Sequence, residues 1–349
     1  MRLTKTLVAG AAFVALAMGT VAARAETVLR MNNWLPPHHS QVVHTMVPWA
    51  KQVEEATKGS VKVQLTDASL GAPPRQYDLA VDGVVDVVFG VLGYTPGRFQ
   101  LYKMAEMPGA EKAEAVSAAL WRTYKTHFEK ADEYKDVVLL ALFAHGSSRI
   151  LTSERVGPVT TLDAYKGKKI RVGGAAAELV NAGLGGTNVS APANEVYEMM
   201  SNGVVDGTLL PFEAYPSFNL KGVVKYAASV PGGLQFGIWF AAMNKEAFAR
   251  LSAEEQQALM SVSGEALSRL GAQTFDNADT AARAQMVADG VTLVDVEPSF
   301  VEGLQRVLVP FEQEWLATAD KLGVDGKAAL AMLREETAKV DAELKAAAK

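Results

Sequence analysis

The sequence predicts an α/β protein of two similar lobes, because it contains an internal repeat and is long enough for two domains. Residues 77–86 (YDLAVDGVVD) and 197–206 (YEMMSNGVVD) both place a tyrosine six residues before a glycine and end in Gly-Val-Val-Asp. An apolar run follows each unit, which is typical of a short helix, a glycine stop and a buried strand. The alternative is that this order is common to α/β proteins in general. Two units 120 residues apart favour two lobes with a ligand cleft between them.

The first 25 residues have the features of an export signal. Arg2 and Lys5 precede an uncharged apolar run over residues 7–20, and Ala-Arg-Ala at 23–25 predicts cleavage after Ala25. We therefore expect a periplasmic protein, with an uncleaved anchor as the alternative. The run is shorter than the roughly 20 residues of a comfortable membrane helix. The remaining chain, residues 26–349, is longer than one ordinary hydrophobic core, which again indicates two domains.

Composition excludes several classes of function. The chain has no cysteine, which rules out disulfides, thiol catalysis and cysteine-ligated metals. Loss of the leader removes Arg2, Lys5 and Arg24 and no acid, so the formal charge falls from −5 to −8. Such an acidic chain is a poor partner for nucleic acid or anionic lipid, although a local positive site can still bind an anionic ligand.

The periodicity of the first half predicts alternating strands and helices. Strands are expected at residues 27–31, 61–65, 87–89 and 137–143, and helices at 44–57 and 111–130. The turn at residues 145–148 ends the first lobe in this interpretation.

The second half repeats the pattern and adds long helices. Residues 166–172 are expected to form a turn that leads into a strand. A helix is expected at 178–182, followed by the second repeat unit. Ser-Ala-Glu-Glu at 252–255 is a capping box that opens a helical pattern reaching residue 289. This pattern predicts either one helix lying across both lobes or two helices broken at Gly264 and Gly271. The tail, residues 326–348, is also helical in pattern.

Arg171 is the strongest candidate for ligand binding. It lies two residues into the strand predicted within residues 166–172, and a guanidinium offers a planar fork of donors that matches a carboxylate. The alternative is a strand-edge arginine paired with a surface acid. Arg149, which follows the turn at 145–148, is either a second anion contact or part of a salt bridge at the hinge.

Aromatic residues at strand ends and in loops predict an apolar or aromatic ligand body. Trp34 follows the first strand, beside two prolines and His38, and is a candidate wall of the cleft. Further candidates are Tyr94, Phe212, Tyr215, Phe236 and Trp239. Core packing is the alternative for each of them, but several near one cleft favour an aromatic ligand.

Metal binding and catalysis have weak support in the sequence. His38, His39 and His44 form the densest histidine group, but their spacing is not that of a helical i, i+4 pair. No nucleophile elbow, zinc-protease motif, phosphate loop or dinucleotide-binding motif is present. We expect no enzyme activity, no metal and no cofactor. An exported hydrolase or isomerase and a metal-uptake protein are the alternatives.

Several of these motifs together resemble the periplasmic solute-binding proteins of TRAP (tripartite ATP-independent periplasmic) transporters, the DctP-like family. The matching segments are Lys-Gly-Lys-Lys-Ile-Arg-Val at 166–172, Asn-Glu-Val-Tyr at 194–197 and Gly-Val-Val-Asp-Gly at 203–207. The resemblance implies a periplasmic-binding-protein fold with strands crossing between lobes and a long helix spanning both. It implies a small organic acid as ligand and integral membrane permease subunits as partners. We expect a monomer.

The resemblance also implies roles for individual residues. Arg171 matches the arginine that binds the ligand carboxylate, Arg149 falls near a second family arginine, and Asn32 to Trp34 fall where the first lobe contacts ligand. Ala193, Leu210 and the pair Gly90 and Val91 replace larger or polar residues of sialic-acid-binding members. The pocket is therefore expected to be less polar and to suit a compact acid with an apolar or aromatic body.

The predicted domain boundaries follow from these features. Residues 1–25 are the signal peptide. The first lobe comprises residues 26–145 and about 236–275, and the second comprises residues 146–235 and about 276–349.

Overall fold

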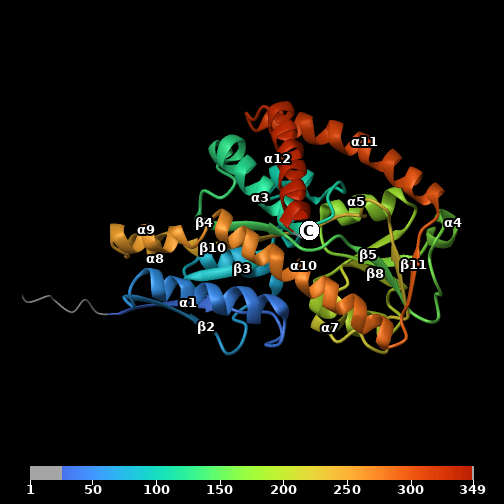
Figure 1. Ribbon diagram of the computed structural model, residues 1–349, viewed down its shortest axis with the longest axis horizontal. Helices are drawn as coiled ribbons and strands as arrows, with labels where there is room; N and C mark the ends of the chain where they lie inside the picture. The colour runs from blue at the N-terminus through green and yellow to red at the C-terminus, as the bar shows by residue number, and fades with distance from the viewer. Residues whose placement is uncertain (1–25, 348–349) are drawn as a thin grey trace, which may run out of the picture.

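The computed structural model describes residues 26–347, which form a two-lobed α/β protein (Figure 1). The expected signal peptide and its cleavage site at Ala25 lie outside the described residues. The strands of the first lobe form one sheet, in which β10 arrives from far along the chain. They are β1 (Thr27–Asn32), β2 (Val61–Leu65), β3 (Val87–Val91), β4 (Val137–Ala144) and β10 (Ile238–Asn244).

The second sheet is built mainly from the middle of the chain. Its strands are β5 (Arg149–Thr152), β6 (Lys169–Val172), β7 (Thr187–Ser190), β8 (Gly207–Leu210), β9 (Tyr226–Ser229) and β11 (Thr292–Asp295). The chain crosses from the first sheet to the second after β4, returns for β10, and crosses again before β11. The predicted crossovers between lobes are therefore confirmed.

The two sheets share a strand order over most of their width. The first sheet runs β2-β1-β3-β10-β4, and the second contains the run β7-β6-β8-β5-β9 with β11 added at its edge. In both runs the first three strands are parallel and the fourth is antiparallel to the third. The internal repeat in the sequence corresponds to this shared arrangement.

Each repeat unit folds as the sequence predicts. Helix α2 (Gln76–Val81) leads through Gly83 into β3, and helix α6 (Val196–Ser201) leads through Gly203 into β8. The two glycines have nearly identical left-handed backbone angles, with φ of +66° and +67°. Glycine adopts this conformation without the steric cost that a Cβ would bring, so each unit turns sharply from helix to strand.

The remaining helices lie around the two sheets. They are α1 (Val47–Ala56), α3 (Ala113–Thr123), α4 (Leu162–Tyr165), α5 (Ala175–Gly183), α7 (Ala214–Ser217), α8 (Lys245–Ala249), α9 (Ala253–Ser261), α10 (Glu265–Ala288), α11 (Pro298–Lys321) and α12 (Gly326–Ala347). Two helices predicted as regular are partly irregular, since π-helical turns lie at Val42–Met46 before α1 and at Tyr124–Phe128 after α3.

The long helical pattern that starts at Ser252 is broken once. Gly264 has φ of +64° and separates α9 from α10, so a single helix to residue 289 was the wrong prediction. Helix α10 passes through Gly271 without a break. The Phe143 ring fills the space that a side chain at Gly271 would need. Helix α10 contacts α3 and β4 at one end and α7 and β11 at the other. Figure 1 shows it reaching from one lobe to the other, which confirms a helix that spans both.

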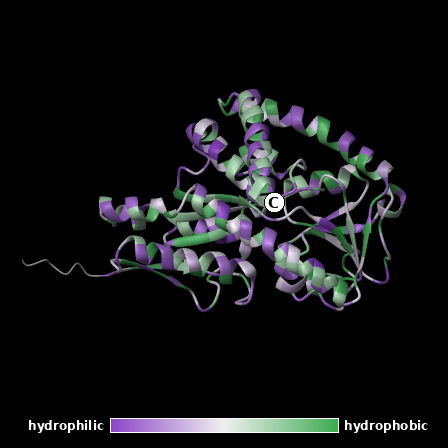
Figure 2. Cartoon of the chain, viewed as in Figure 1, coloured by the Kyte–Doolittle hydropathy of each residue, from purple (hydrophilic) through white to green (hydrophobic). Residues whose placement is uncertain are grey.

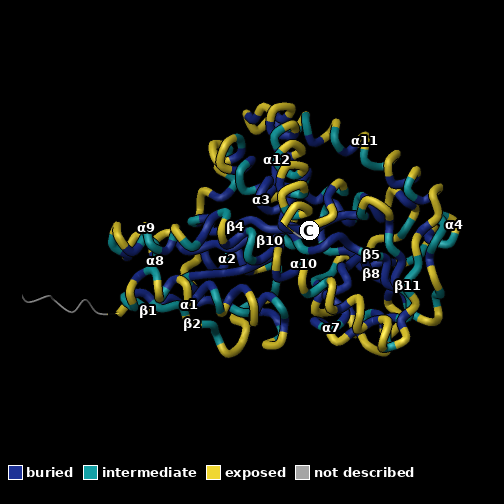
Figure 3. The backbone as a smooth tube through the Cα atoms, viewed as in Figure 1, coloured by how far each residue is buried: buried dark blue, intermediate teal, exposed yellow. Residues whose placement is uncertain are grey.

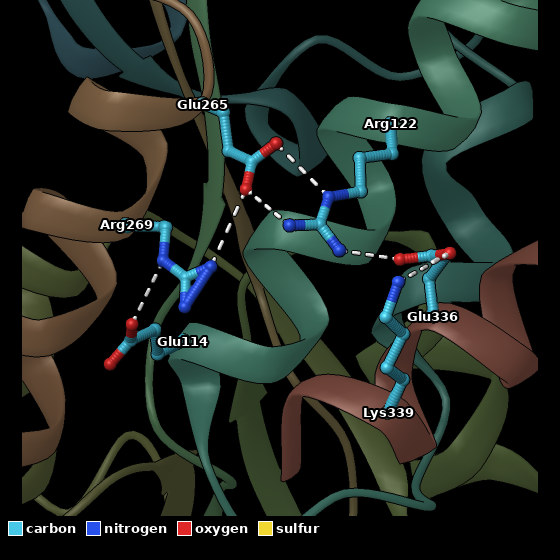
Figure 4. Close-up of polar contacts among 6 residues, drawn as sticks. All are labelled: Glu114, Arg122, Glu265, Arg269, Glu336 and Lys339. Carbon is cyan, nitrogen blue, oxygen red and sulfur yellow. Dashed lines mark hydrogen bonds and ion pairs between the residues drawn. The ribbon is translucent and has the colours of Figure 1, made fainter. Parts of the chain in front are cut away.

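A network of charges holds the C-terminal helix on the first lobe (Figure 4). Arg122 on α3 binds Glu265 at 2.7 Å and also binds Glu336 on α12. Arg269 on α10 binds Glu114 at 3.0 Å. Helix α12 packs against α3 beside the first sheet, whereas the predicted division placed it with the second lobe. Helix α11 contacts α5 of the second lobe, so α11 and α12 together bridge the lobes.

Apolar residues fill the interior of both lobes. Figure 3 shows the central strands of both sheets as buried, whereas the edge strands β7 and β11 of the second sheet are largely exposed. Figure 2 shows hydrophilic residues along α10, α11 and α12. Strand β3 is buried along its full length. Among residues 26–347, no helix combines the length and the apolar character needed to cross a membrane.

Candidate functional site

A small cavity lies between the lobes, where the ends of β3, β6 and β8 meet the start of β10. About 40 Å³ of it is open to the centre of a water molecule, which is room for a few waters. Larger hollows of about 300 and 550 Å³ lie on the outer surface, but no buried cation faces them among the described residues. Residues lining the interlobe cavity include Tyr94, Glu106, His145, Arg171, Ala193, Leu210, Glu213 and Trp239.

Arg171 carries the positive charge of the interlobe cavity. Its side chain is 1 % exposed, and within residues 26–347 it forms no ion pair. Its Nε donates to the Ala191 carbonyl at 2.8 Å and its Nη2 donates to the Tyr94 hydroxyl at 3.2 Å, which leaves Nη1 without a partner in the same part of the chain. The expected alternative of a surface arginine paired with an acid is therefore wrong. A buried cation without a counter-ion is costly, and an anionic ligand would remove that cost.

Glycines bring the two lobes into contact beside Arg171. A Cβ on Gly93, which follows β3, would lie 2.7 Å from the Gly173 carbonyl oxygen in the second lobe. A Cβ on Gly173 would lie 2.7 Å from Nη2 of Arg171. The Tyr94 hydroxyl also accepts from the Ala193 N–H at 2.9 Å, so it bridges the lobes. The two lobes are thus closed on each other, and these contacts across the cleft are possible only because the positions are glycines.

Aromatic rings form the first-lobe wall of the cavity. Trp239 on β10 is 5 % exposed and stacks on Trp34, with ring centroids 5.5 Å apart and an angle of 15° between the planes. Trp34 also contacts Tyr94 edge to face at 6.2 Å, and its Nε1 donates to the Phe89 carbonyl at 3.0 Å. Trp34 therefore supports the wall from behind, whereas Trp239 and Tyr94 face the cavity.

Burial favours the neutral forms of three other lining residues, Glu106, Glu213 and His145. Burial raises the pKa of Glu106 to about 8 and that of Glu213, which accepts from the Ser217 hydroxyl at 2.9 Å, also to about 8. Burial lowers the pKa of His145 to about 4. Arg171 is then the uncompensated charge among the described lining residues, and a net charge of +1 suits a monoanion better than a dianion.

Two predicted ligand contacts lie away from the cavity lining. Arg149 donates through Nη1 to the Ser147 carbonyl at 2.7 Å, and its guanidinium stacks over the Phe212 ring at 4.7 Å. Asp279 of α10 provides the nearby negative charge. Arg149 and Phe212 thus lie together near the spanning helix. Among residues 26–347 Arg149 forms no ion pair, so the salt bridge expected as its alternative role is not seen there.

Asn32 and His38 are also outside the cavity lining. Asn32 is fully buried, donates to Gln76 at 2.7 Å and accepts from the Leu70 N–H at 2.9 Å, so internal partners use its polar atoms. His38 is exposed and lines an outer groove with His44.

The histidine cluster has no metal-site geometry. His39 is fully buried, and burial lowers its pKa to about 3. Among residues 26–347, no group of three or more His, Cys, Asp or Glu side chains could hold a metal ion.

Sequence reasoning missed three titratable residues of the lining. Glu106 and Glu213 resemble any other acid in the sequence, because nothing local indicates that they are buried. His145 was noted as part of the turn at 145–148, but no pattern indicated that it faces the cavity. Only the packing of both lobes brings these residues to Arg171.

Comparison with known proteins identifies relatives along nearly the whole chain. Residues 31–317 match the family described as bacterial extracellular solute-binding protein, family 7 (DctP). The chain is 32% identical over 316 residues to "Outer membrane transporter protein TsaT" of Comamonas testosteroni, a match covering 89% of this chain and 91% of that protein.

Solved structures of similar proteins contain aromatic acids. A TRAP periplasmic solute-binding protein of Bordetella bronchiseptica with bound (R)- and (S)-mandelate is 38% identical, with a TM-score of 0.87, covering 90% of this chain and 99% of that one. A TRAP solute-binding protein of Rhodoferax ferrireducens with copurified benzoate is 26% identical, with a TM-score of 0.84 and coverage of 91% and 99%. A marine metagenome protein specific for aromatic acid ligands, in complex with 3-hydroxybenzoate, is 30% identical, with a TM-score of 0.83 and coverage of 90% and 99%.

Proposed function

This chain belongs to family 7 of the bacterial extracellular solute-binding proteins, the DctP family, and on that premise we propose that it captures a small aromatic monocarboxylate between its lobes. The family comprises extracytoplasmic transport proteins of the TRAP type and not enzymes. The ligand is therefore held and released without chemical change.

The observation that carries the proposal is the buried, unpaired guanidinium of Arg171. Nη1 is free and Nη2 has a second hydrogen available, so the end of the fork presents the two donors that a carboxylate accepts side by side. Hydrogen bonds to charged groups contribute about 1.5–3 kcal/mol each. Two of them supply a large part of the affinity of a small ligand.

The rest of the lining supports an aromatic body. Trp239 presents an aromatic surface, and Ala193 and Leu210 face it from the second lobe, where they leave apolar space. The relatives that hold mandelate, benzoate or 3-hydroxybenzoate support the same class of ligand. Arg171, Tyr94 and Trp239 are the proposed ligand contacts, with Trp34 behind them.

In this proposal the protein first binds its ligand between the lobes and then delivers the ligand to the membrane. The exported chain, cleaved after Ala25, acts as a monomer, and its lobes close on the acid and present a changed outer surface to membrane permease subunits. The lobes are residues 26–145 with about 236–275, and 146–235 with about 276–349, with α12 packed back on the first lobe. Arg149, Phe212, Asn32 and His38 shape the lobes and the hinge in this proposal.

Calorimetric titration with benzoate and mandelate tests the proposal. Wild type is expected to bind at least one of these acids, and Arg171→Ala is expected to lose about 100-fold or more in affinity. Arg155→Ala, which removes an exposed arginine of the same lobe, is the matched control and should bind as wild type does. Equal affinity of wild type and Arg171→Ala would remove the guanidinium from the binding site. Mass spectrometry of ligand copurified with the protein gives an independent identification.

A further inference from the structure

We infer that the ligand carries a hydroxyl group besides its carboxylate, and that the Trp239 indole N–H and the Glu106 carboxyl form hydrogen bonds with that hydroxyl. The inference deepens the proposed function and rests on it. Its starting point is that two residues lining the same cavity each have a buried polar atom without a hydrogen-bond partner.

The indole nitrogen of Trp239 and Oε2 of Glu106 are both buried without a hydrogen-bond partner among residues 26–347. Their residues are 5 % and 3 % exposed, and both line the interlobe cavity. A buried polar atom without a partner costs about 1–3 kcal/mol. The neighbouring Trp34 differs in this respect, because its indole N–H reaches the Phe89 carbonyl.

Packing prevents Trp239 from turning towards another partner. Its ring is stacked on Trp34 at 5.5 Å and on Phe143 at 6.1 Å, and it also contacts Phe275 at 5.5 Å. Rings held from several sides keep one orientation, so the indole N–H cannot turn towards another partner. The carboxyl of Glu106 lies at the end of the short helix Leu101–Glu106, near the backbone of Ile238, the residue before Trp239.

The chemistry of the unpartnered groups selects a hydroxyl. The Trp239 indole is a donor only, so its partner must accept. Glu106 is protonated at pH 7, because burial raises its pKa to about 8, and it offers an O–H. His145 has Nδ1 2.6 Å from the Gly146 carbonyl oxygen and 3.4 Å from the Gly237 nitrogen. The shorter contact favours a hydrogen on Nδ1, which makes Nε2 the acceptor. A hydroxyl both accepts and donates, whereas a second carboxylate would face a lining with one positive charge.

Two pairs of acids that differ by one hydroxyl test the inference by calorimetry: benzoate with 3-hydroxybenzoate, and phenylacetate with mandelate. In at least one pair, wild type is expected to bind the hydroxylated acid about tenfold more tightly. Trp239→Phe keeps an aromatic ring and removes the N–H, and should reduce this preference to within about twofold. Glu106→Met, an apolar side chain of similar length, should reduce it too. Trp121→Phe, a tryptophan outside the cavity lining, is the matched control and should retain the preference.

The outcomes separate the inference from the proposed function. If wild type binds both members of each pair equally, or if the preference survives Trp239→Phe, the inference is overturned and water serves the two atoms. The proposed function would stand in that case. If wild type binds none of the four acids, the proposed function itself fails. Because the measured quantity is a ratio of affinities within one variant, a general loss of stability in Trp239→Phe or Glu106→Met does not mimic the expected result.

Discussion

Asn32 in the first lobe and Arg171 in the second occupy the same position in two copies of one strand arrangement. Asn32 of β1 pairs with Val88 of β3, and Arg171 of β6 pairs with Thr208 of β8. Val88 and Thr208 each stand five residues after the glycine of the repeat unit, Gly83 or Gly203. The two lobes thus present different side chains from one backbone framework.

The difference lies in whether the side chain is satisfied by its own lobe. The amide of Asn32 is bonded to Gln76 and to the Leu70 N–H. The guanidinium of Arg171 bonds to the Ala191 carbonyl and reaches Tyr94 of the other lobe, and still has a free nitrogen. Asn32, whose polar atoms are hydrogen-bonded within its own lobe, stabilises that lobe. Arg171, whose charge has no counter-ion, is available to bind an anionic ligand.

The framework itself is maintained by a second shared feature. The carboxylate of Asp86 accepts from the Arg30 N–H at 2.8 Å, and that of Asp206 accepts from the Lys169 N–H at 2.9 Å. These bonds tie the last residue of each repeat unit to the neighbouring strand. The common backbone therefore rests on matched local contacts, and the ligand chemistry rests on one residue that differs.

Exchange of the two side chains should produce the largest effect. Arg171→Asn makes the second lobe resemble the first and should weaken binding of an aromatic acid by about 100-fold or more, since two charge-assisted hydrogen bonds are lost. Asn32→Arg buries a charge without a partner and should lower the free energy of unfolding by about 3–5 kcal/mol without adding a binding site. Calorimetry and urea unfolding measure the two quantities. Tight binding by Arg171→Asn would contradict the comparison.

Alkaline pH should lower the free energy of unfolding of the protein, because two buried carboxyls line the cavity. Glu106 and Glu213 have pKa values raised from 4.5 to about 8 in the folded protein. When the pKa of a group is higher in the folded than in the unfolded protein, its contribution to stability is fully present below the unfolded-state pKa. That contribution is lost as the pH rises through the folded-state pKa. The free energy of unfolding should therefore fall from pH 6.5 to about 8 and then level off.

Urea unfolding between pH 6.5 and 9 checks this, in a range where His39 and His145, whose pKa values are lowered to about 3 and 4, stay neutral in the folded state. Glu106→Gln and Glu213→Gln should each reduce the slope. A slope that neither variant changes would show that other groups titrate.

Closure of the lobes should depend on Gly93. A methyl group there would meet the Gly173 carbonyl of the other lobe at 2.7 Å, so Gly93→Ala should oppose closure and lower ligand affinity by about tenfold. The free energy of unfolding without ligand should change little, because the clash is between lobes and not within one. Gly71→Ala, whose methyl would meet Leu79 of its own lobe at 3.2 Å, is the control. Unchanged affinity in Gly93→Ala would mean that this contact is not needed for binding.

The two repeat glycines should respond alike. Gly83→Ala and Gly203→Ala each place a Cβ in the left-handed region and should each cost about 1–2 kcal/mol in the free energy of unfolding. Ligand affinity measured on the folded protein should stay near that of wild type. Urea unfolding of both variants provides the comparison, and a clear difference between them would indicate that the two units do not support their lobes equally.

The smallest effects are expected from the exposed arginines that pair with the repeat aspartates. Arg250 lies 3.1 Å from Asp86 and Arg155 lies 2.9 Å from Asp206, and the two arginines are 61% and 62% exposed. Exposed ion pairs contribute about 0.2–1 kcal/mol, so Arg250→Ala and Arg155→Ala should each lower stability by less than about 1 kcal/mol. Thermal unfolding at low and high salt measures this. A larger loss from one of them would reveal an additional role.

The sequence by itself determined the local structure. The repeat predicted α2 and α6, the glycine turns and the strands β3 and β8, because backbone preference and apolar periodicity act over a few residues. Arg171 could be selected because its guanidinium matches a carboxylate and because its segment resembles the ligand-binding segment of the family. The break at Gly264 was foreseen as one of two outcomes, and contacts with Trp121 near that glycine are specific to the folded chain.

The tertiary structure alone decided which residues share the cavity. Arg149, Asn32 and His38 are near Arg171 or near strand ends in sequence, yet the fold turns them to the hinge, the lobe interior and the outer surface. Glu106 and Glu213 come from separate segments, and their burial and raised pKa values exist only when both lobes pack around them. Burial and electrostatic environment are sums over non-local neighbours, so no short stretch of sequence contains them.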